Sequence, residues 1–120
     1  MKELTKAEEE VMHYLWQMEK AFVKDIIARM PKPKPAYNTV STIIRILEQK
    51  GFVDHRSFGK THEYFPLIKK EEYTRFSMKL LMKGYFGNSF KNMVSFFAKD
   101  NRMSVKELDE IMKEIKKEIK

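Results

Sequence analysis

The sequence predicts a mainly α-helical protein that contains one β-hairpin, and three observations support this fold class. Apolar residues recur at helical spacing before residue 50 and again from Lys69 onward. Between these parts lies a stretch rich in aromatic and β-branched residues, 52–67, with Gly59 at its centre. Two capping boxes, which begin at Thr5 and Ser104, mark the starts of helices.

The first helix is predicted to start at Thr5, and the second is predicted to cover roughly residues 22–30. Thr5-Lys6-Ala7-Glu8 starts the first, because Thr and Glu at this spacing each satisfy a free backbone N–H. The segment "PKPKPA", residues 31–36, ends the second, since proline cannot continue a helix interior. The expected apolar stripes are Val11, Met12, Leu15 and Trp16 in the first helix, and Val23, Ile26, Ile27 and Met30 in the second.

The third helix is predicted from about Ala36 to Lys50, and Gly51 supplies its left-handed end. One face is predicted to be apolar, with Tyr37 at its edge; its residues at helical spacing are Ala36, Val40, Ile43, Ile44 and Leu47. The opposite face carries polar residues of which only one is charged, unlike a solvent face of alternating Lys and Glu. These residues are Asn38, Ser41, Thr42, Arg45 and Gln49.

Two strands, 52–57 and 61–66, are predicted to form a hairpin through a turn at Phe58-Gly59-Lys60. Three further helices follow. Three helices and a hairpin wing form the winged helix-turn-helix arrangement, whose third helix enters a DNA major groove. We therefore expect a winged-helix DNA-binding domain at residues 1–68 and a C-terminal helical dimerisation region at 69–120.

Composition narrows the class of partner. The 120 residues contain 24 Lys and Arg against 17 Asp and Glu, a net charge of +7, which favours nucleic acid or an anionic membrane surface. No apolar run reaches the length of a membrane span, and the acidic, polar start is unlike a secretory signal, so a cytoplasmic protein without membrane insertion is expected.

The sequence predicts neither a catalytic site nor a metal-binding site. The chain has no cysteine, and its three histidines lie far apart without acidic companions at ligand spacing. No nucleophile–base pair and no phosphate-binding glycine loop is present. The sequence therefore predicts a protein that is not an enzyme and needs no cofactor.

Contacts with double-stranded DNA are predicted from the third helix and the hairpin. Base edges in the major groove present donors and acceptors, which suit the polar helix face, and cations on the wing suit phosphates. The alternatives are a solvated helix face and a winged-helix module that binds protein and not DNA. The predicted base contacts are Asn38, Ser41, Thr42 and Arg45, and the predicted backbone contacts are Thr39, Gln49, Arg56 and Lys60.

The C-terminal region is too short to bury a core of its own, so it must pack on the N-terminal part or on a second chain. A dimer is the simpler interpretation, because twofold DNA sites need a twofold protein. The residues expected at the dimer interface are Tyr73, Phe76, Leu80, Phe97, Leu108, Ile111, Met112 and Ile115, and Ile119 continues the last seam.

Three segments, "LTKAEEEVMHYLW", "YNTVSTIIRILEQKGFVDH" and "THEYFPLIKKEEY", resemble the BlaI/MecI/CopY family of bacterial transcriptional repressors. The match extends from Leu4 to about Ile115. The resemblance implies a homodimer that binds an inverted-repeat operator through its winged helices and represses transcription. It also implies dimerisation through the C-terminal helices.

The resemblance also bears on regulation. In the antibiotic-resistance branch a membrane sensor protease signals, and the repressor is cleaved at an Asn-Phe bond. The corresponding bond here is Ser95-Phe96, with Ser in place of Asn. The copper-responsive branch carries a C-terminal cysteine cluster, which this chain lacks.

Overall fold

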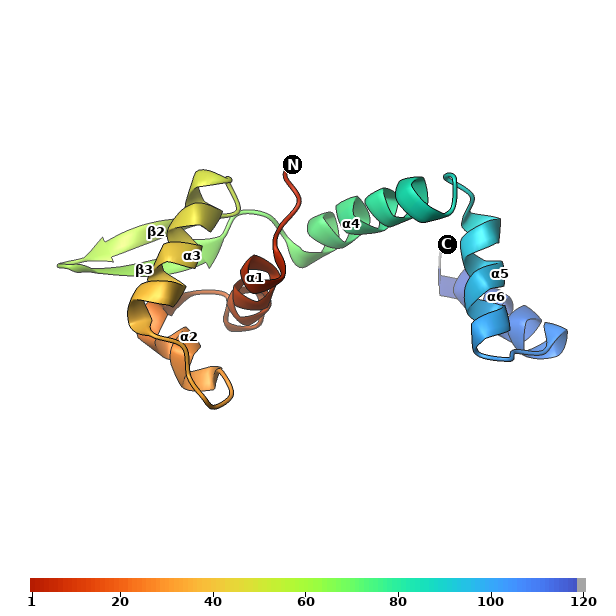
Figure 1. Cartoon of the computed structure of the whole chain (residues 1–120), viewed down its shortest axis with the longest axis horizontal. Helices are drawn as coiled ribbons and strands as arrows, with labels where there is room; N and C mark the ends of the chain where they lie inside the picture. Colours follow the sequence, from red (N-terminus) through yellow and green to blue (C-terminus); the bar gives the residue numbers. More distant parts are fainter. Residues whose placement is uncertain (119–120) are drawn as a thin grey trace. The chain divides into compact units, whose positions relative to one another are not determined.

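The computed structural model describes residues 1–118, and these form two compact units, the first from Met1 to Ser77 and the second from Met78 onward (Figure 1). Ile119, predicted on the last apolar seam, lies outside the described residues. The elements are α1 (Lys6–Met18), β1 (Ala21–Phe22), α2 (Val23–Arg29), α3 (Tyr37–Gln49), β2 (Val53–Phe58), β3 (Thr61–Pro66), α4 (Lys70–Tyr85), α5 (Phe90–Asp100) and α6 (Val105–Glu118).

The predicted start of α1 and the predicted bounds of α2 and α3 agree with the structure to within one residue. At the start of α1 the backbone N–H of Glu8 donates to Thr5 Oγ1 and that of Thr5 to Glu8 Oε1, which confirms the capping box. At the end of α3, Gly51 has φ +82°, a conformation that glycine adopts without strain. The prediction of a winged helix-turn-helix is confirmed.

One strand was not predicted. β1 pairs antiparallel with β3 through Ala21↔Tyr64 and Phe22↔Glu63, so the sheet has three strands in the order β1-β3-β2. Two residues are too few to show the alternation that identifies a strand. The pairing fixes the start of α2 against the wing.

The turn between α2 and α3 is held by a single cation. Lys34 Nζ donates to the backbone carbonyls of Ile27, Ala28 and Met30, each at 2.9 Å. The last carbonyls of a helix lack further intrahelical donors, and of these three the Ile27 carbonyl also accepts the backbone N–H of Met30, so the ammonium group completes the C-terminal cap of α2. The turn thereby fixes where α3 begins.

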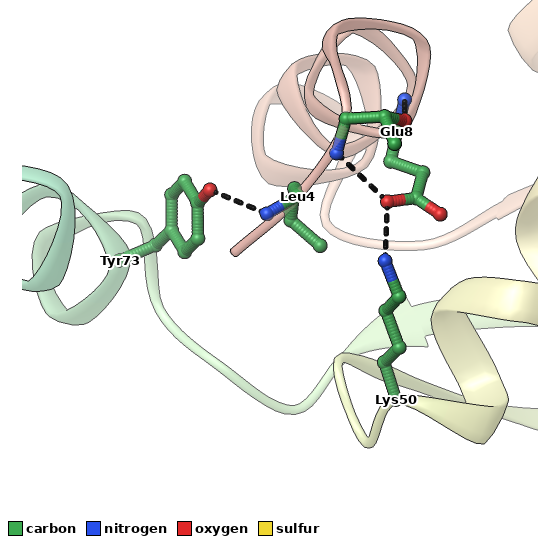
Figure 2. Close-up of polar contacts among 5 residues, drawn as sticks. Leu4, Glu8, Lys50 and Tyr73 are labelled. Atoms are coloured by element: carbon green, nitrogen blue, oxygen red, sulfur yellow. Dashed lines mark hydrogen bonds and ion pairs between the residues drawn. The ribbon is translucent and has the colours of Figure 1, made fainter. Parts of the chain in front are cut away.

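A partly buried ion pair joins α3 to α1 (Figure 2). Lys50 Nζ lies 2.7 Å from Glu8 Oε1, and the Glu8 side chain is only 6% exposed. Burial tends to raise the pKa of Glu8. The hydrogen bonds from Lys50 and from the Thr5 backbone N–H outweigh this effect and hold the pKa below its ordinary value.

Glu8→Gln is expected to lower the free energy of unfolding at pH 7 by about 1–2 kcal/mol, because a charge-assisted bond is lost. Since the folded-state pKa is lowered, this stabilisation exists above the ordinary carboxyl pKa and disappears as pH falls through the lower value. Urea unfolding at pH 7 and at about pH 3 should therefore show the difference between variant and wild type shrinking in acid. Glu10→Gln, at an exposed position two residues further along α1, is the control. A difference that is independent of pH would contradict this account.

Tyr73 was predicted at the dimer interface, and the structure corrects this. It is 5% exposed, and its hydroxyl accepts the backbone N–H of Leu4 at 2.9 Å (Figure 2). Its ring packs against Trp16, Phe52 and Phe76. Tyr73 therefore belongs to the core of the N-terminal unit and has almost no surface left for a second chain. This is why that unit extends to Ser77, past the boundary predicted at residue 68.

Candidate nucleic-acid interface

The outer face of α3 is polar and accessible, as predicted. The side chains of Asn38, Thr42, Arg45 and Gln49 are exposed. Thr42 Oγ1 donates to the backbone carbonyl of Asn38 at 2.8 Å, which leaves the Thr42 methyl group and the hydroxyl lone pairs free to face outward. Ile46 lies among them and is 36% exposed, so the face also has an apolar element.

Ser41 is placed differently from the prediction. It is 6% exposed, so the expectation that it lies on the open polar face is wrong. It lines a groove between α3 and the wing together with Lys60, His62 and Tyr64. Its hydroxyl accepts a hydrogen bond from Arg45 Nη2 at 3.1 Å. Ser41 therefore holds the guanidinium of Arg45, and offers little surface to a ligand itself.

The groove beside Ser41 has a volume of about 230 Å³, and its rim carries cations from both elements, Arg45 from α3 and Lys60 from the wing tip. Tyr37, His62 and Tyr64 also line it. Burial and the negative charge of Glu48 raise the pKa of Tyr64, and Arg45 opposes them. Tyr64 therefore stays a neutral hydrogen-bonding group. The groove is suited to an anion that approaches α3 and the wing together.

The two cations predicted to contact DNA from the wing differ in the charge of their neighbours. Gly59 has φ +63° and forms the tight turn of the hairpin, which leaves Lys60 exposed at the tip. Arg56 is also exposed, but it is paired in register with Glu63 on β3. Opposite charges on facing positions partly compensate each other. Lys60 is therefore the less compensated of the two cations.

The remaining predicted DNA-contact residues lie at the two ends of α3. Thr39 is in the first turn and Gln49 in the last, and both are exposed. Tyr37 and His62 were missed by sequence reasoning. Tyr37 is 55% exposed, yet it falls at the edge of the apolar stripe, and that position gave no signal for a surface role.

A cluster of potential ligands at the other end of the wing was also missed. Glu48, Asp54 and His55 bring one ligand atom each to within 4.8 Å of one another. His55 therefore has two acidic companions in the fold, contrary to the prediction. Glu48 lies seven residues earlier on α3, and the turn at Gly51 brings it beside β2.

The C-terminal unit buries very little of its apolar surface. Met93 is its one buried hydrophobic residue among the residues that the structure describes. Leu80, Phe97, Ile111 and Ile115, all predicted at a dimer interface, are exposed by 39–48%. Leu108 and Met112 are half-buried and lie on the same seam of α6 as Ile111. Phe76 instead packs on the N-terminal core.

Ser95 and Phe96 lie inside α5, and both side chains are exposed. In the part of the chain that the structure describes, every helix is too short or too polar to cross a membrane.

The fold and this surface can be compared with known proteins. The sequence profile of the penicillinase repressor family matches residues 4–117. The chain belongs to the penicillinase repressor family. This confirms the predicted resemblance, and members of this family are repressors and not enzymes, as the sequence predicts.

Individual relatives agree with the family assignment. The chain is 26% identical to the methicillin resistance regulatory protein MecI of Staphylococcus aureus over 110 residues, which cover 91% of this chain and 89% of the relative. It is 23% identical to the penicillinase repressor of Bacillus licheniformis, covering 91% and 86%. The solution structure of the DNA-binding domain of the repressor BlaI aligns with a TM-score of 0.52 and 27% identity, covering 61% of this chain and 94% of that domain.

Proposed function

We propose that this penicillinase repressor family member is a dimeric repressor that binds an inverted-repeat operator in double-stranded DNA, with α3 in the major groove. The observation that carries the proposal is the exposed, weakly charged face of α3, on which Ser41 fixes Arg45 beside a cationic groove. Base edges require donors and acceptors in fixed positions more than they require net charge. The structural similarity to the DNA-binding domain of BlaI supports the proposal that this chain binds DNA.

Each residue of this surface has a proposed role. Arg45 is suited to guanine, because its guanidinium can donate two parallel hydrogen bonds to O6 and N7, and the Asn38 amide is suited to adenine. Thr42 presents a methyl group that can contact thymine. Ser41 acts through Arg45. The proposed contacts to the DNA backbone are Thr39, Gln49, Arg56 and Lys60.

The proposed dimer forms through the C-terminal unit. Apolar side chains of α6 recur at positions 108, 111, 112 and 115, which produces one continuous seam on the helix. Exposed apolar seams of this kind are typical of surfaces that a partner covers. Two copies would place two α3 helices on half-sites about one helical turn apart.

We include regulation by a membrane sensor protease in the proposal because the family resemblance implies it. Cleavage at Ser95-Phe96 would require α5 to open locally, because the bond lies inside a hydrogen-bonded helix. The small buried area of the C-terminal unit favours such opening.

Arg45→Ala is expected to weaken binding to the cognate operator by about 1–3 kcal/mol and to relax the preference at one base pair in each half-site. Binding to random duplex should weaken much less, because Arg45 is proposed to contact a base and not a phosphate. A series of base substitutions in the operator, titrated with wild type and variant, measures both effects.

Lys60→Ala is the matched control for this experiment. It removes one exposed cation from the wing tip, so it should weaken cognate and random DNA alike and reduce the slope of log affinity against log salt by about one. If Arg45→Ala behaves as this control does, Arg45 contacts only the backbone. A wild type that shows no salt-dependent binding to any duplex would favour the alternative, a winged-helix module that binds protein.

A further inference from the structure

Three side chains at the junction of α3 and the wing have the geometry of a metal site. Glu48, Asp54 and His55 contribute one ligand atom each, and all three atoms lie within 4.8 Å of one another. Bonds from carboxylate oxygen or imidazole nitrogen to a divalent ion such as zinc are about 2.0–2.2 Å long, so two ligands of one ion lie about 3–4 Å apart. Small side-chain rotations would therefore bring all three onto one ion.

The backbone that carries these ligands is well fixed. Glu48 lies in the last turn of α3, and Asp54 and His55 lie on β2. Gly51 reverses the chain between them, and Phe52, which is fully buried, anchors the reversal in the core. Sites built on the ends of regular elements keep their geometry better than sites on loops.

The imidazole is already oriented towards the carboxylates. His55 Nδ1 contacts Glu48 Oε2, and the His55 backbone N–H donates to Asp54 Oδ1 at 2.7 Å. The His55 ring stacks on His62 with the ring centroids 4.1 Å apart and the planes 7° apart, which restrains its rotation. The side chains of Glu48 and His55 are 31% and 28% exposed, so an ion can reach them from solvent.

We propose that Glu48, Asp54 and His55 bind a divalent transition-metal ion of the zinc and nickel class, with water completing the coordination. An imidazole ligand favours these ions over magnesium and calcium, which prefer oxygen ligands alone. The chain has no thiolate, so copper(I) is disfavoured. The two carboxylates supply the negative charge that a divalent ion neutralises.

Isothermal titration of the full chain with zinc chloride at about pH 7.5, in a non-chelating buffer, tests the proposal. We expect saturable binding of one ion per chain. Glu48→Gln, Asp54→Asn and His55→Gln should each weaken binding at least about tenfold, because a ligand atom is lost. His13→Gln, which changes a histidine on α1 outside the cluster, is the matched control and should bind as the wild type does. Saturable binding that is equally strong in His55→Gln, or no saturable binding of zinc or nickel, would overturn the proposal.

A second measurement uses the wild type alone and so does not depend on the folding of any variant. Zinc should shift the backbone amide NMR signals of residues 48–55 and leave those of α1 unchanged. Shifts that centre elsewhere, or that are absent at zinc concentrations where heat is measured, would also overturn the assignment of the site.

Discussion

Ile111→Asp is expected to convert the protein into a monomer whose winged helix is still folded. Ile111 lies on the apolar seam of α6 and is 43% exposed, and in the proposed dimer the second chain covers it. A carboxylate buried there without a partner destabilises the interface by several kcal/mol. Each 1.4 kcal/mol corresponds to about tenfold in affinity, so the dimer should weaken by roughly a hundredfold or more. Sedimentation velocity measures this directly.

Operator binding should fall with the dimer. A monomer can occupy one half-site, so the footprint should shorten to a single half-site at high protein concentration. Ile111→Leu keeps an apolar side chain of similar size and should remain dimeric and bind as wild type. A dimeric Ile111→Asp variant would place the interface on another surface, whatever its affinity for DNA.

Tyr73→Ala is expected to destabilise the N-terminal unit by about 3–5 kcal/mol, because truncating a buried aromatic residue leaves a cavity among Trp16, Phe52 and Phe76. Tyr73→Phe keeps the ring and loses only the hydrogen bond to the Leu4 backbone, so it should cost about 1 kcal/mol. Chemical denaturation followed by the fluorescence of Trp16, whose ring contacts Tyr73, reports on this unit.

The two Tyr73 variants also separate a core role from an interface role. If Tyr73 belongs to the core, Tyr73→Phe should leave the monomer–dimer equilibrium unchanged. A Tyr73→Ala protein that is fully folded, equally stable and monomeric would restore the interpretation that the sequence suggested.

Local patterns were enough to predict most of the fold. The capping box at Thr5, the proline-rich end of α2 and the glycine at position 51 each act within a few residues, and the structure confirms them. The apolar stripe of α3 follows the helical period, and three of its five predicted residues, Val40, Ile44 and Leu47, are buried. Ile43 is only half-buried, and Ala36, which precedes the helix, is exposed.

Contacts between distant segments account for what could not be predicted. Whether Tyr73 faces the core or a partner depends on Leu4, which is 69 residues away in sequence. Ser41 shares its groove with residues of the wing, which are distant from it in sequence. The helical period alone places it at the margin of the exposed face. Glu48 and His55 lie close together only because the chain reverses direction at Gly51, and the sequence does not show this direction.

The small core of the C-terminal unit has a consequence for how long the protein survives in a cell. With Met93 as the one buried hydrophobic residue among the described residues of this unit, an unpaired chain leaves α5 and α6 open to housekeeping proteases. If a second chain covers these helices in a dimer, the lifetime of the protein rises with its concentration, because a larger fraction of the chains is then dimeric. As growth dilutes the protein, a larger fraction of the chains would be unpaired and would be degraded faster. The protein concentration would then fall faster than dilution alone predicts, and repression would end abruptly.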